Sequence, residues 1–316
     1  MTQPLVSLCI PTYNPDIAYL HELLESIERQ TWAHIEVLIS DDCSSNFDEV
    51  VSGLSVTKFH RTVVRATERL GMARNWNEAA RSAKGEFLVV VGQDDLLVES
   101  GIETLVEAAM SSGAGLVFGG QGYIGAKGQR IESPSRSLRR DAVLPVEKLQ
   151  LSPAALIALG LSFGNVLGDP CSTLIRRRDF ERTSGFSTEF RHAADLELWL
   201  RLASEGTTAV SLPTEVAFHR SHDANATISH VSSGTAQADR LGLHNTYGGS
   251  LADNEVWNRS ALRLYVHAAY DMFRHGIPPI KGYPQLRGPA TALASACVTE
   301  IMEQLRLKKP DMSKVI

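Results

Sequence analysis

The chain has 316 residues, of which 43% are hydrophobic, and a formal net charge of −5 at pH 7. This length and apolar content allow a full hydrophobic core in one large domain or two smaller ones, and the negative charge excludes nucleic acid as an expected partner. The four cysteines lie far apart without paired spacing, which excludes a zinc site and a disulfide framework and favours a reducing cytosol.

The first residues lack a basic stretch followed by a long apolar run, so we expect no secretory signal and a cytoplasmic protein. Residues 149–168 carry no charge, but Ser152, Pro153, Asn165 and three glycines interrupt the segment. It is too polar for a membrane span, which needs ~20 apolar residues.

Short apolar runs alternate with segments of helical period through the first half of the chain. The runs at 5–10, 35–39, 87–91 and 115–118 predict strands that are covered on both faces. A stripe formed by Leu20, Leu23, Leu24 and Ile27 predicts one helix, and residues 72–83 predict another. This alternation predicts an α/β fold in which helices flank a mostly parallel sheet.

The second half of the chain has a different character. Residues 120–144 are rich in glycine, serine and arginine, which indicates loops and short strands, and a helix is expected at 195–204 with Gly206 after its end. Apolar stripes from Trp257 to Met272 and from Leu293 to Leu305 predict further helices. We therefore predict one domain over residues 1–224 and a helical C-terminal extension over 225–316.

Three of the predicted strands end in polar clusters, at residues 11–14, 40–44 and 93–95. Because ligands bind beyond the carboxyl ends of parallel strands, we expect these clusters to converge on one crevice.

Asp94 and Asp95 are adjacent carboxylates at the end of an apolar run. Two neighbouring negative charges oppose each other unless a cation lies close to them. Ligation of magnesium or manganese, which also hold substrate phosphates, would explain the pair. A polar turn before the next helix is the alternative.

Asp41 and Asp42 repeat this pattern at the end of another strand. An Asx-type turn leading into Ser44 is one explanation. However, turn chemistry has to be invoked twice to explain both acidic pairs. A carboxylate here would accept hydrogen bonds from a nucleobase or a ribose.

The helix expected after Gly71 carries Arg74 in its first turn. Helix N-termini and arginine both attract phosphate, so Arg74 is predicted near a diphosphate, with a solvated helix charge as the alternative. Asp195 opens the helix at 195–204. It is either an N-cap, worth ~1 kcal/mol, or a general base within reach of an acceptor hydroxyl.

His219 and His222 lie three residues apart and are either surface residues or ligands of a metal ion. A histidine that joins carboxylates around one ion would favour manganese over magnesium. His222 is the stronger candidate.

The order of these motifs resembles that of the family 2 nucleotide-sugar glycosyltransferases, inverting enzymes of the GT-A fold that are common in bacterial polysaccharide synthesis. The resemblance is carried by LCIPTYN at 8–14, LISDDCS at 38–44, GMARN at 71–75 with AKGEF at 83–87, and RSH at 220–222. It spans residues 5–225.

By this resemblance, residues 1–224 form a GT-A (Rossmann-like) nucleotide-sugar-binding catalytic domain, and the site residues take the family's roles. The base-binding loop would be formed by Pro11, Thr12, Tyr13 and Asn14, and Asp42 would face the base. Arg74 would contact the diphosphate, and Asp94 would contact the ribose. The metal would be bound by Asp95 and His222, and Asp195 would be the catalytic base.

The resemblance also implies the reaction. A metal-dependent, inverting hexosyltransferase would move a sugar from a nucleoside-diphosphate sugar, with Mn²⁺ or Mg²⁺, to a hydroxyl of a saccharide or lipid-linked saccharide in cell-surface polysaccharide synthesis. A lipid-linked acceptor would bring the protein to the inner face of the membrane. The C-terminal helices would form a dimer face, an acceptor lid or a membrane-surface patch, and we favour a homo-oligomer.

Two departures from the family pattern favour a different function. Family members often have an aspartate where Gly92 stands and an acidic residue where Ala194 precedes Asp195. The alternative is therefore a catalytically silent nucleotide-sugar-binding scaffold module. A nucleotidyltransferase is a third hypothesis, but it would carry a glycine-rich basic loop where this chain has PTYNP at 11–15.

Overall fold

A computed structural model of the protein describes residues 3–53, 58–132, 147–222 and 234–248. The chain divides into two units, Met1–Ala226 and Thr227–Ile316. The described part of the second unit holds helix α10, Thr235–Tyr247. The apolar stripes expected between residues 257 and 305, and with them the homo-oligomer face, lie outside the described residues. The helical extension over 225–316 therefore stays a prediction.

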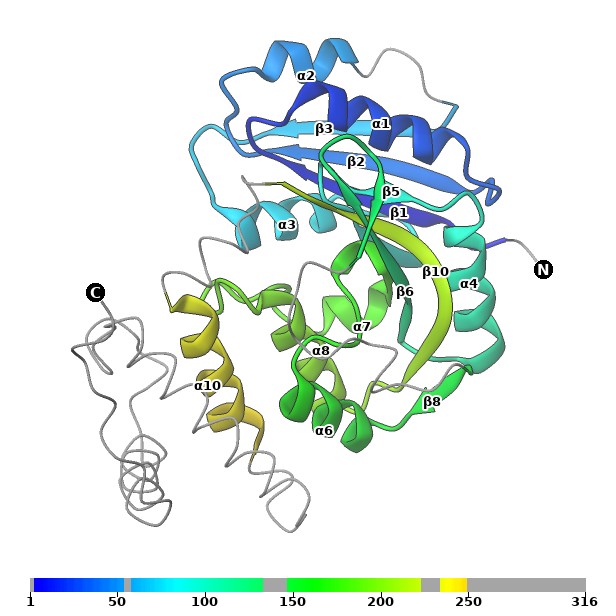
Figure 1. Ribbon diagram of the computed structural model, residues 1–316, viewed down its shortest axis with the longest axis vertical. Helices are drawn as coiled ribbons and strands as arrows, with labels where there is room; N and C mark the ends of the chain where they lie inside the picture. Colours follow the sequence, from blue (N-terminus) through cyan, green and yellow to red (C-terminus); the bar gives the residue numbers. More distant parts are fainter. Residues whose placement is uncertain (1–2, 54–57, 133–146, 223–233, 249–316) are drawn as a thin grey trace. The chain divides into compact units, whose positions relative to one another are not determined.

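The first unit is built on one sheet. Its strands follow the order β3-β2-β1-β4-β9-β6-β10-β5, with β7 paired to β6 and β8 paired to β10 (Figure 1). Their bounds are β1 Val6–Thr12, β2 Ile35–Asp41, β3 His60–Arg65, β4 Phe87–Val90, β5 Leu96–Leu97, β6 Leu116–Gly125, β7 Arg130–Ile131, β8 Leu149–Leu151, β9 Thr173–Arg176 and β10 Ala209–Ser221.

The longest ladders of the sheet are parallel. Strand β1 pairs in parallel with β2 and β4, β2 pairs in parallel with β3, and β6 does so with β10. The short strand β9 runs antiparallel between β4 and β6. The predicted α/β fold with a mostly parallel sheet is therefore confirmed. The carboxyl ends of β1, β2, β4 and β10 all lie at the same edge.

Helices cover both faces of this sheet. They are α1 Ile17–Glu28, α2 Phe47–Gly53, α3 Met72–Arg81, α4 Gly101–Ser112, α6 Pro153–Phe163, α7 Arg177–Glu181 and α8 Ala194–Ser204, with a 3₁₀ turn, η1, at Pro170–Ser172. Figure 1 shows α1 and α2 on one side of β1 to β3 and α3 on the other.

The predicted stripe of α1 packs into the core. Leu20, Leu23 and Ile27 are buried in one cluster with Val6 and Leu8 of β1, and each such side chain contributes about 1.5–3 kcal/mol through its burial. The helix begins after Asp16, whose carboxylate accepts hydrogen bonds from the first backbone amides. This capping fixes the point at which α1 starts after the loop that follows β1.

Strand β6 is longer than the predicted run at 115–118 because its glycines allow close contact with β10. A Cβ atom at Gly119 would lie 2.3 Å from Val216 Cγ2, and one at Gly122 would lie 2.5 Å from Phe218 Cδ1. A glycine-rich stretch that appears irregular in the sequence is therefore a buried strand, paired with β10 over most of its length.

Helix α8 begins one residue earlier than predicted. Ala193 is the N-cap residue and Ala194 starts the helix, so Asp195 is not the cap that one interpretation of the sequence expected. Gly206, with φ of 90°, follows the end of the helix as predicted. Asp195 therefore needs another explanation than capping.

No helix in the described part of the chain is long and apolar enough to cross a membrane. Within the uncharged stretch at 149–168, α6 has 11 residues. Cys9, Cys43 and Cys171 carry free thiols, and Cys297 lies outside the described residues.

Candidate active site

The turn between β4 and β5 carries the two adjacent aspartates, and the end of β10 supplies a histidine to each. Nε2 of His222 lies 2.7 Å from Asp94 Oδ2. Nδ1 of His219 lies 3.3 Å from Asp95 Oδ1. The structure thus brings His222, predicted as a metal ligand with Asp95, onto Asp94, and it brings the other histidine onto Asp95.

Burial and like charges shape the electrostatics of this turn. The side chain of Asp95 is 7% exposed. Its pKa is raised to about 6, first by desolvation and further by Asp94 and Asp169, against the opposing effects of His219 and the Arg220 amide. Burial alone would lower the pKa of His219, but the three aspartates outweigh it and raise that pKa.

Gly92 allows both carboxylates to approach the backbone. A Cβ atom here would lie 2.7 Å from Asp95 Oδ2 and 3.2 Å from Asp94 Oδ1. A side chain at this position would therefore push against the acidic pair. Family members often have an aspartate at this position, but here an aspartate would fit only if the neighbouring carboxylates moved.

Arg220 supports the acidic turn, and the sequence placed it in the RSH motif at 220–222 without indicating a role for it. Its side chain is fully buried, Nε donates to the Asp94 carbonyl at 2.7 Å, and Nη2 donates to Glu22 at 2.5 Å. Its guanidinium carbon lies 4.3 Å from the ring centre of Tyr19. The Nε contact ties this cation to the main chain of the turn.

The loop after β1 offers fewer side chains than predicted. Pro11 and Thr12 are buried, and Thr12 Oγ1 donates to Asp41 at 3.0 Å. The side chains of these two residues are therefore not available to a ligand. Tyr13 is half-buried and Asn14 is exposed, and the Arg69 guanidinium carbon lies 3.4 Å from the Tyr13 ring centre.

The aspartates after β2 have different environments. Asp41 is buried and accepts hydrogen bonds from the Ser44 amide at 2.9 Å and the Ser44 hydroxyl at 2.5 Å. The turn explanation is therefore confirmed for Asp41. The carboxylate of Asp42 accepts from the amides of Leu70 and Gly71. Asp42 thus ties the end of β2 to the entry of α3.

Arg74 is exposed on α3 and lines a polar pocket of about 450 Å³, whose wall includes Asn77, Glu197 and Arg201. Within the described residues, no hydrogen bond or ion pair joins Arg74 to the other predicted site residues. Its diphosphate role stays a prediction.

Asp195 projects from the first turn of α8 and is half-buried. Asn165 Nδ2 donates to its Oδ2 at 2.6 Å, and the Leu196 amide donates to its Oδ1 at 2.7 Å. Desolvation and, second, the charge of Asp169 raise its pKa to about 7, although these two hydrogen bonds act in the opposite direction. A carboxylate with this pKa is suited to accept a proton near neutral pH.

Asp169 is the acidic residue that the sequence analysis missed. It precedes η1, its Oδ2 accepts from Gln121 Nε2 at 2.7 Å, and the same oxygen lies 3.5 Å from His219 Nδ1. Besides burial, its charge helps to raise the pKa of both Asp95 and Asp195. Asp169 thus links the acidic turn to α8. The one available signal is that it is the first charge after the uncharged stretch at 149–168.

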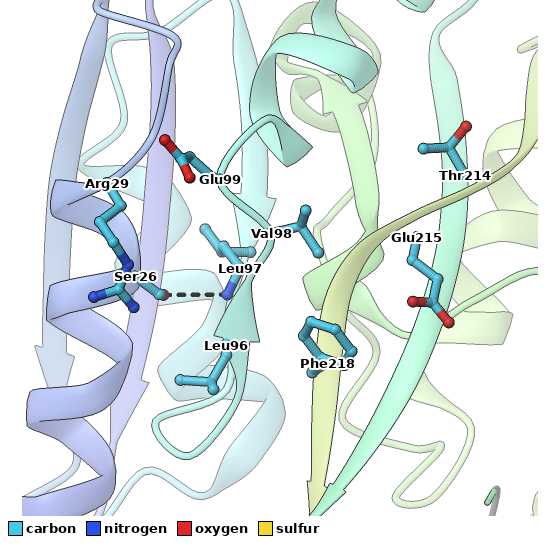
Figure 2. Close-up of a pocket in the computed structure, with 9 residues that line it drawn as sticks. All are labelled: Ser26, Arg29, Leu96, Leu97, Val98, Glu99, Thr214, Glu215 and Phe218. Atoms are coloured by element: carbon cyan, nitrogen blue, oxygen red, sulfur yellow. Dashed lines mark hydrogen bonds between the residues drawn. The ribbon is translucent and has the colours of Figure 1, made fainter. Parts of the chain in front are cut away.

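A hollow of about 580 Å³ lies beside β5 and β10 (Figure 2). Leu97 and Phe218 line it, and the Leu97 amide donates to Ser26 Oγ at 3.1 Å. Because successive side chains on a strand point to opposite faces, Phe218 and its neighbour His219 face different sides of β10. The hollow is therefore separate from the acidic site.

Three of the known proteins most similar to this chain are named as glycosyltransferases. An uncharacterized glycosyltransferase of Haemophilus influenzae is 26% identical over 265 residues, which cover 83% of this chain and 84% of that protein. The abequosyltransferase RfbV of Salmonella typhimurium is 29% identical over 56% of this chain and 54% of its own length. An uncharacterized glycosyltransferase of Rickettsia felis is 28% identical, and the match spans 31% of its length.

Two solved structures share the fold. The mannosyltransferase PcManGT of Pyrobaculum calidifontis, in complex with GDP-Man and Mn²⁺, has a TM-score of 0.60 and 20% identity, covering 98% of this chain and 82% of that one. TarS of S. aureus, residues 1–349 in complex with UDP-GlcNAc, has a TM-score of 0.57 and 16% identity, covering 96% and 91%. These likenesses support the GT-A fold.

The family model described as glycosyl transferase family 2 matches residues 7–183, from β1 to the end of α7. This range is more than half of the chain and includes the acidic turn, the loop after β1 and Asp169. The chain therefore belongs to glycosyl transferase family 2, and it is a glycosyltransferase.

Proposed function

We propose that this protein transfers a hexose from a nucleoside-diphosphate sugar to a hydroxyl of a saccharide or lipid-linked saccharide, with inversion at the anomeric carbon and with Mn²⁺ or Mg²⁺ bound. Membership of family 2 supports the sugar transfer. The UDP-GlcNAc bound to TarS and the GDP-Man bound to PcManGT support a nucleotide-sugar donor, and the Mn²⁺ bound to PcManGT supports a cation.

The residues of the acidic turn fit such a cation in kind. Within the described residues, no group of three or more histidine, cysteine, aspartate or glutamate side chains forms a metal cage. Magnesium-like cations, however, keep several waters and take one or two carboxylates together with substrate phosphates. Asp95 and His222 would hold the ion, with His219 beside Asp95 as a further candidate. When bound, it would stabilise the charge of the departing diphosphate.

The chain's own residues would perform the remaining steps. Tyr13 and Asn14 would contact the base, Asp94 the ribose and Arg74 the diphosphate. Asp195 would take the proton of the acceptor hydroxyl while the hydroxyl oxygen attacks the anomeric carbon. The bond from that carbon to the diphosphate oxygen would break on the opposite face. A single displacement of this kind inverts the anomeric centre.

The observation that carries this proposal is the link between Asp195 and the acidic turn. Asn165 binds Asp195, and Asp169, four residues later, lies against the His219 that pairs with Asp95. A donor held at the turn would therefore present its reacting carbon toward Asp195. A base on the far side of the molecule would not serve the reaction.

The test compares the wild type with Asp195→Asn. Nucleoside-diphosphate sugars would be screened by thermal shift with and without Mn²⁺, and transfer would be measured with the donors that bind. We expect Asp195→Asn to abolish transfer and to leave nucleotide affinity, measured by titration calorimetry, nearly unchanged. If Asp195→Asn transferred sugar at the wild-type rate, Asp195 would not be the catalytic base. A wild type that binds donors with Mn²⁺ but never turns them over would refute the proposed reaction.

A further inference from the structure

A short segment, residues 164–169, connects the two halves of the candidate site. It lies between α6 and η1. Near its start, Asn165 Nδ2 donates to Asp195 Oδ2 at 2.6 Å. At its end, Asp169 Oδ2 lies 3.5 Å from His219 Nδ1. The segment therefore holds one further carboxylate between the proposed base and the acidic turn.

This carboxylate is anchored through one oxygen. Gln121 Nε2 donates to Asp169 Oδ2 at 2.7 Å, and the Asp169 amide donates back to Gln121 Oε1 at 3.1 Å. The first hydrogen bond fixes the direction of the Asp169 side chain and the second holds its main chain, because Gln121 is itself held in strand β6. Such a side chain has little rotamer freedom left to lose on binding a ligand.

The other oxygen, Oδ1, has no hydrogen-bond partner within the described part of the chain. The Asp169 side chain is 37% exposed, whereas that of Asp95 is 7% exposed. An ionised carboxylate is acceptor-only and can take about four hydrogen bonds. Asp169 thus combines a fixed orientation with an accessible acceptor, which a residue serving only the packing of the loop would not need.

The carboxylate of Asp169 shares its nearest basic side chain with Asp95. His219 Nδ1 lies 3.5 Å from Asp169 Oδ2 and 3.3 Å from Asp95 Oδ1. A carboxylate forms stronger hydrogen bonds with hydroxyls than a neutral acceptor does. A hydroxyl of the substrate at Oδ1 would therefore be a favourable partner for Asp169.

We propose that Asp169 determines donor specificity by accepting, at Oδ1, a hydrogen bond from a hydroxyl of the sugar that is transferred. This inference rests on the proposed function. A sugar joined to a diphosphate at the acidic turn, and attacked by an acceptor at Asp195, has to lie beside the segment that connects them. The donor class would be a nucleoside-diphosphate hexose with a free ring hydroxyl, and a deoxy sugar that lacks this hydroxyl would be a poor donor.

The experiment measures kcat/KM for pairs of donors. UDP-glucose, UDP-N-acetylglucosamine and GDP-mannose would first identify a donor that the wild type uses. That donor and its 3-deoxy, 4-deoxy and 6-deoxy analogues would then be compared in the wild type, Asp169→Asn and Asp169→Ala. We expect the wild type to discriminate against one deoxy analogue by ~10–100-fold, the worth of a charged hydrogen bond. Asp169→Ala should lose this discrimination.

Asp169→Asn keeps the shape of the side chain, but its one oxygen is needed to accept from Gln121 Nε2, so an NH2 donor takes the place of Oδ1. A sugar hydroxyl can accept only a neutral hydrogen bond from this NH2, so the variant should show a smaller discrimination than the wild type. It provides the test if Asp169→Ala does not fold. Asp48→Asn, an exposed charge change in the first turn of α2, is the matched control and should behave as the wild type.

Several outcomes would overturn this inference. If the wild type transfers sugar and both Asp169 variants keep the full discrimination, Asp169 does not read the sugar. If the variants need a higher Mn²⁺ concentration for half-maximal activity but discriminate between donors as the wild type does, Asp169 contributes to cation binding instead. If the wild type uses no nucleotide sugar at all, the proposed function is wrong, and this inference, which depends on it, is wrong as well.

Discussion

Asn165 donates a hydrogen bond to the carboxylate of Asp195 at 2.6 Å. This contact orients the proposed base. It also opposes the burial and the Asp169 charge that together raise the pKa of Asp195 to about 7. The protonation state of Asp195 is thus set by neighbours that can be changed one at a time.

The pH dependence of transfer should follow Asp195. A general base acts in its ionised form, so kcat/KM should rise with pH, with a midpoint near 7, and level off above it. The measurement is a pH profile of kcat/KM with saturating Mn²⁺. A profile that is already level at pH 5 would contradict the assignment.

Asn165→Ala provides the matched variant for this profile. It removes a hydrogen bond that lowers the pKa of Asp195, so the midpoint should move to higher pH. Nucleotide affinity should stay at the wild-type value, since Asn165 contacts the proposed base rather than the loop after β1. A midpoint that moves to lower pH would show that this hydrogen bond does not stabilise the ionised carboxylate.

Gly92→Ala should reduce transfer by ~10–100-fold, the scale expected when a catalytic group is displaced by a fraction of an ångström to 1 Å. The reason is that the new Cβ atom would lie 2.7 Å from Asp95 Oδ2, so the carboxylate has to move. Gly128→Ala is the control. Its Cβ atom would meet nothing within 4 Å, but φ is +75°, so it should cost about 1–2 kcal/mol of stability and leave activity unchanged. Equal activities of the two variants would contradict the prediction.

Arg220→Lys should lower the free energy of unfolding by about 2–4 kcal/mol. A lysine cannot reproduce the separate hydrogen bonds that Nε and Nη2 of the buried arginine give to the Asp94 carbonyl and to Glu22. Arg29→Lys is the control, because Arg29 forms an exposed ion pair with Glu25 that is worth little. Urea unfolding followed by circular dichroism would measure both. Equal stabilities would show that Arg220 does not support the acidic turn.

Tyr13→Ala should weaken nucleotide binding by ~10–100-fold, because stacking of a base on an aromatic ring is worth about 1–3 kcal/mol. Tyr13→Phe keeps the ring and should bind as the wild type does. Titration calorimetry with UDP and GDP in the presence of Mn²⁺ would measure both variants. Unchanged affinity of Tyr13→Ala would place the base elsewhere.

The central strands could be predicted because a strand covered on both faces has a continuous apolar sequence. Strands β1, β2 and β4 are buried throughout and match the predicted runs. Strand β3 was not predicted, since His60–Arg65 at the edge is half-exposed and polar. Strand β10 was missed because Pro213 and exposed residues interrupt its apolar pattern.

The site could be predicted where a motif combines two chemical groups in a short stretch. The pair Asp94 and Asp95 was visible for this reason. The pairing of these aspartates with two different histidines could not be predicted. The paired residues lie far apart in the chain, and no periodic pattern in the sequence indicates such a contact. Asp169 was missed for a related reason, and Arg220 was quoted in the RSH motif but received no role. A single charged residue in a sequence gives no sign of its burial or of the partner that it will meet.

Asp42 already holds the amides of Leu70 and Gly71 through its own carboxylate. The entry of α3 is therefore fixed during folding, and an incoming nucleotide would not have to order it. Binding should then lose little affinity to conformational entropy, so association rates near those of rigid receptors are expected. The conformational entropy lost on nucleotide binding should therefore be small.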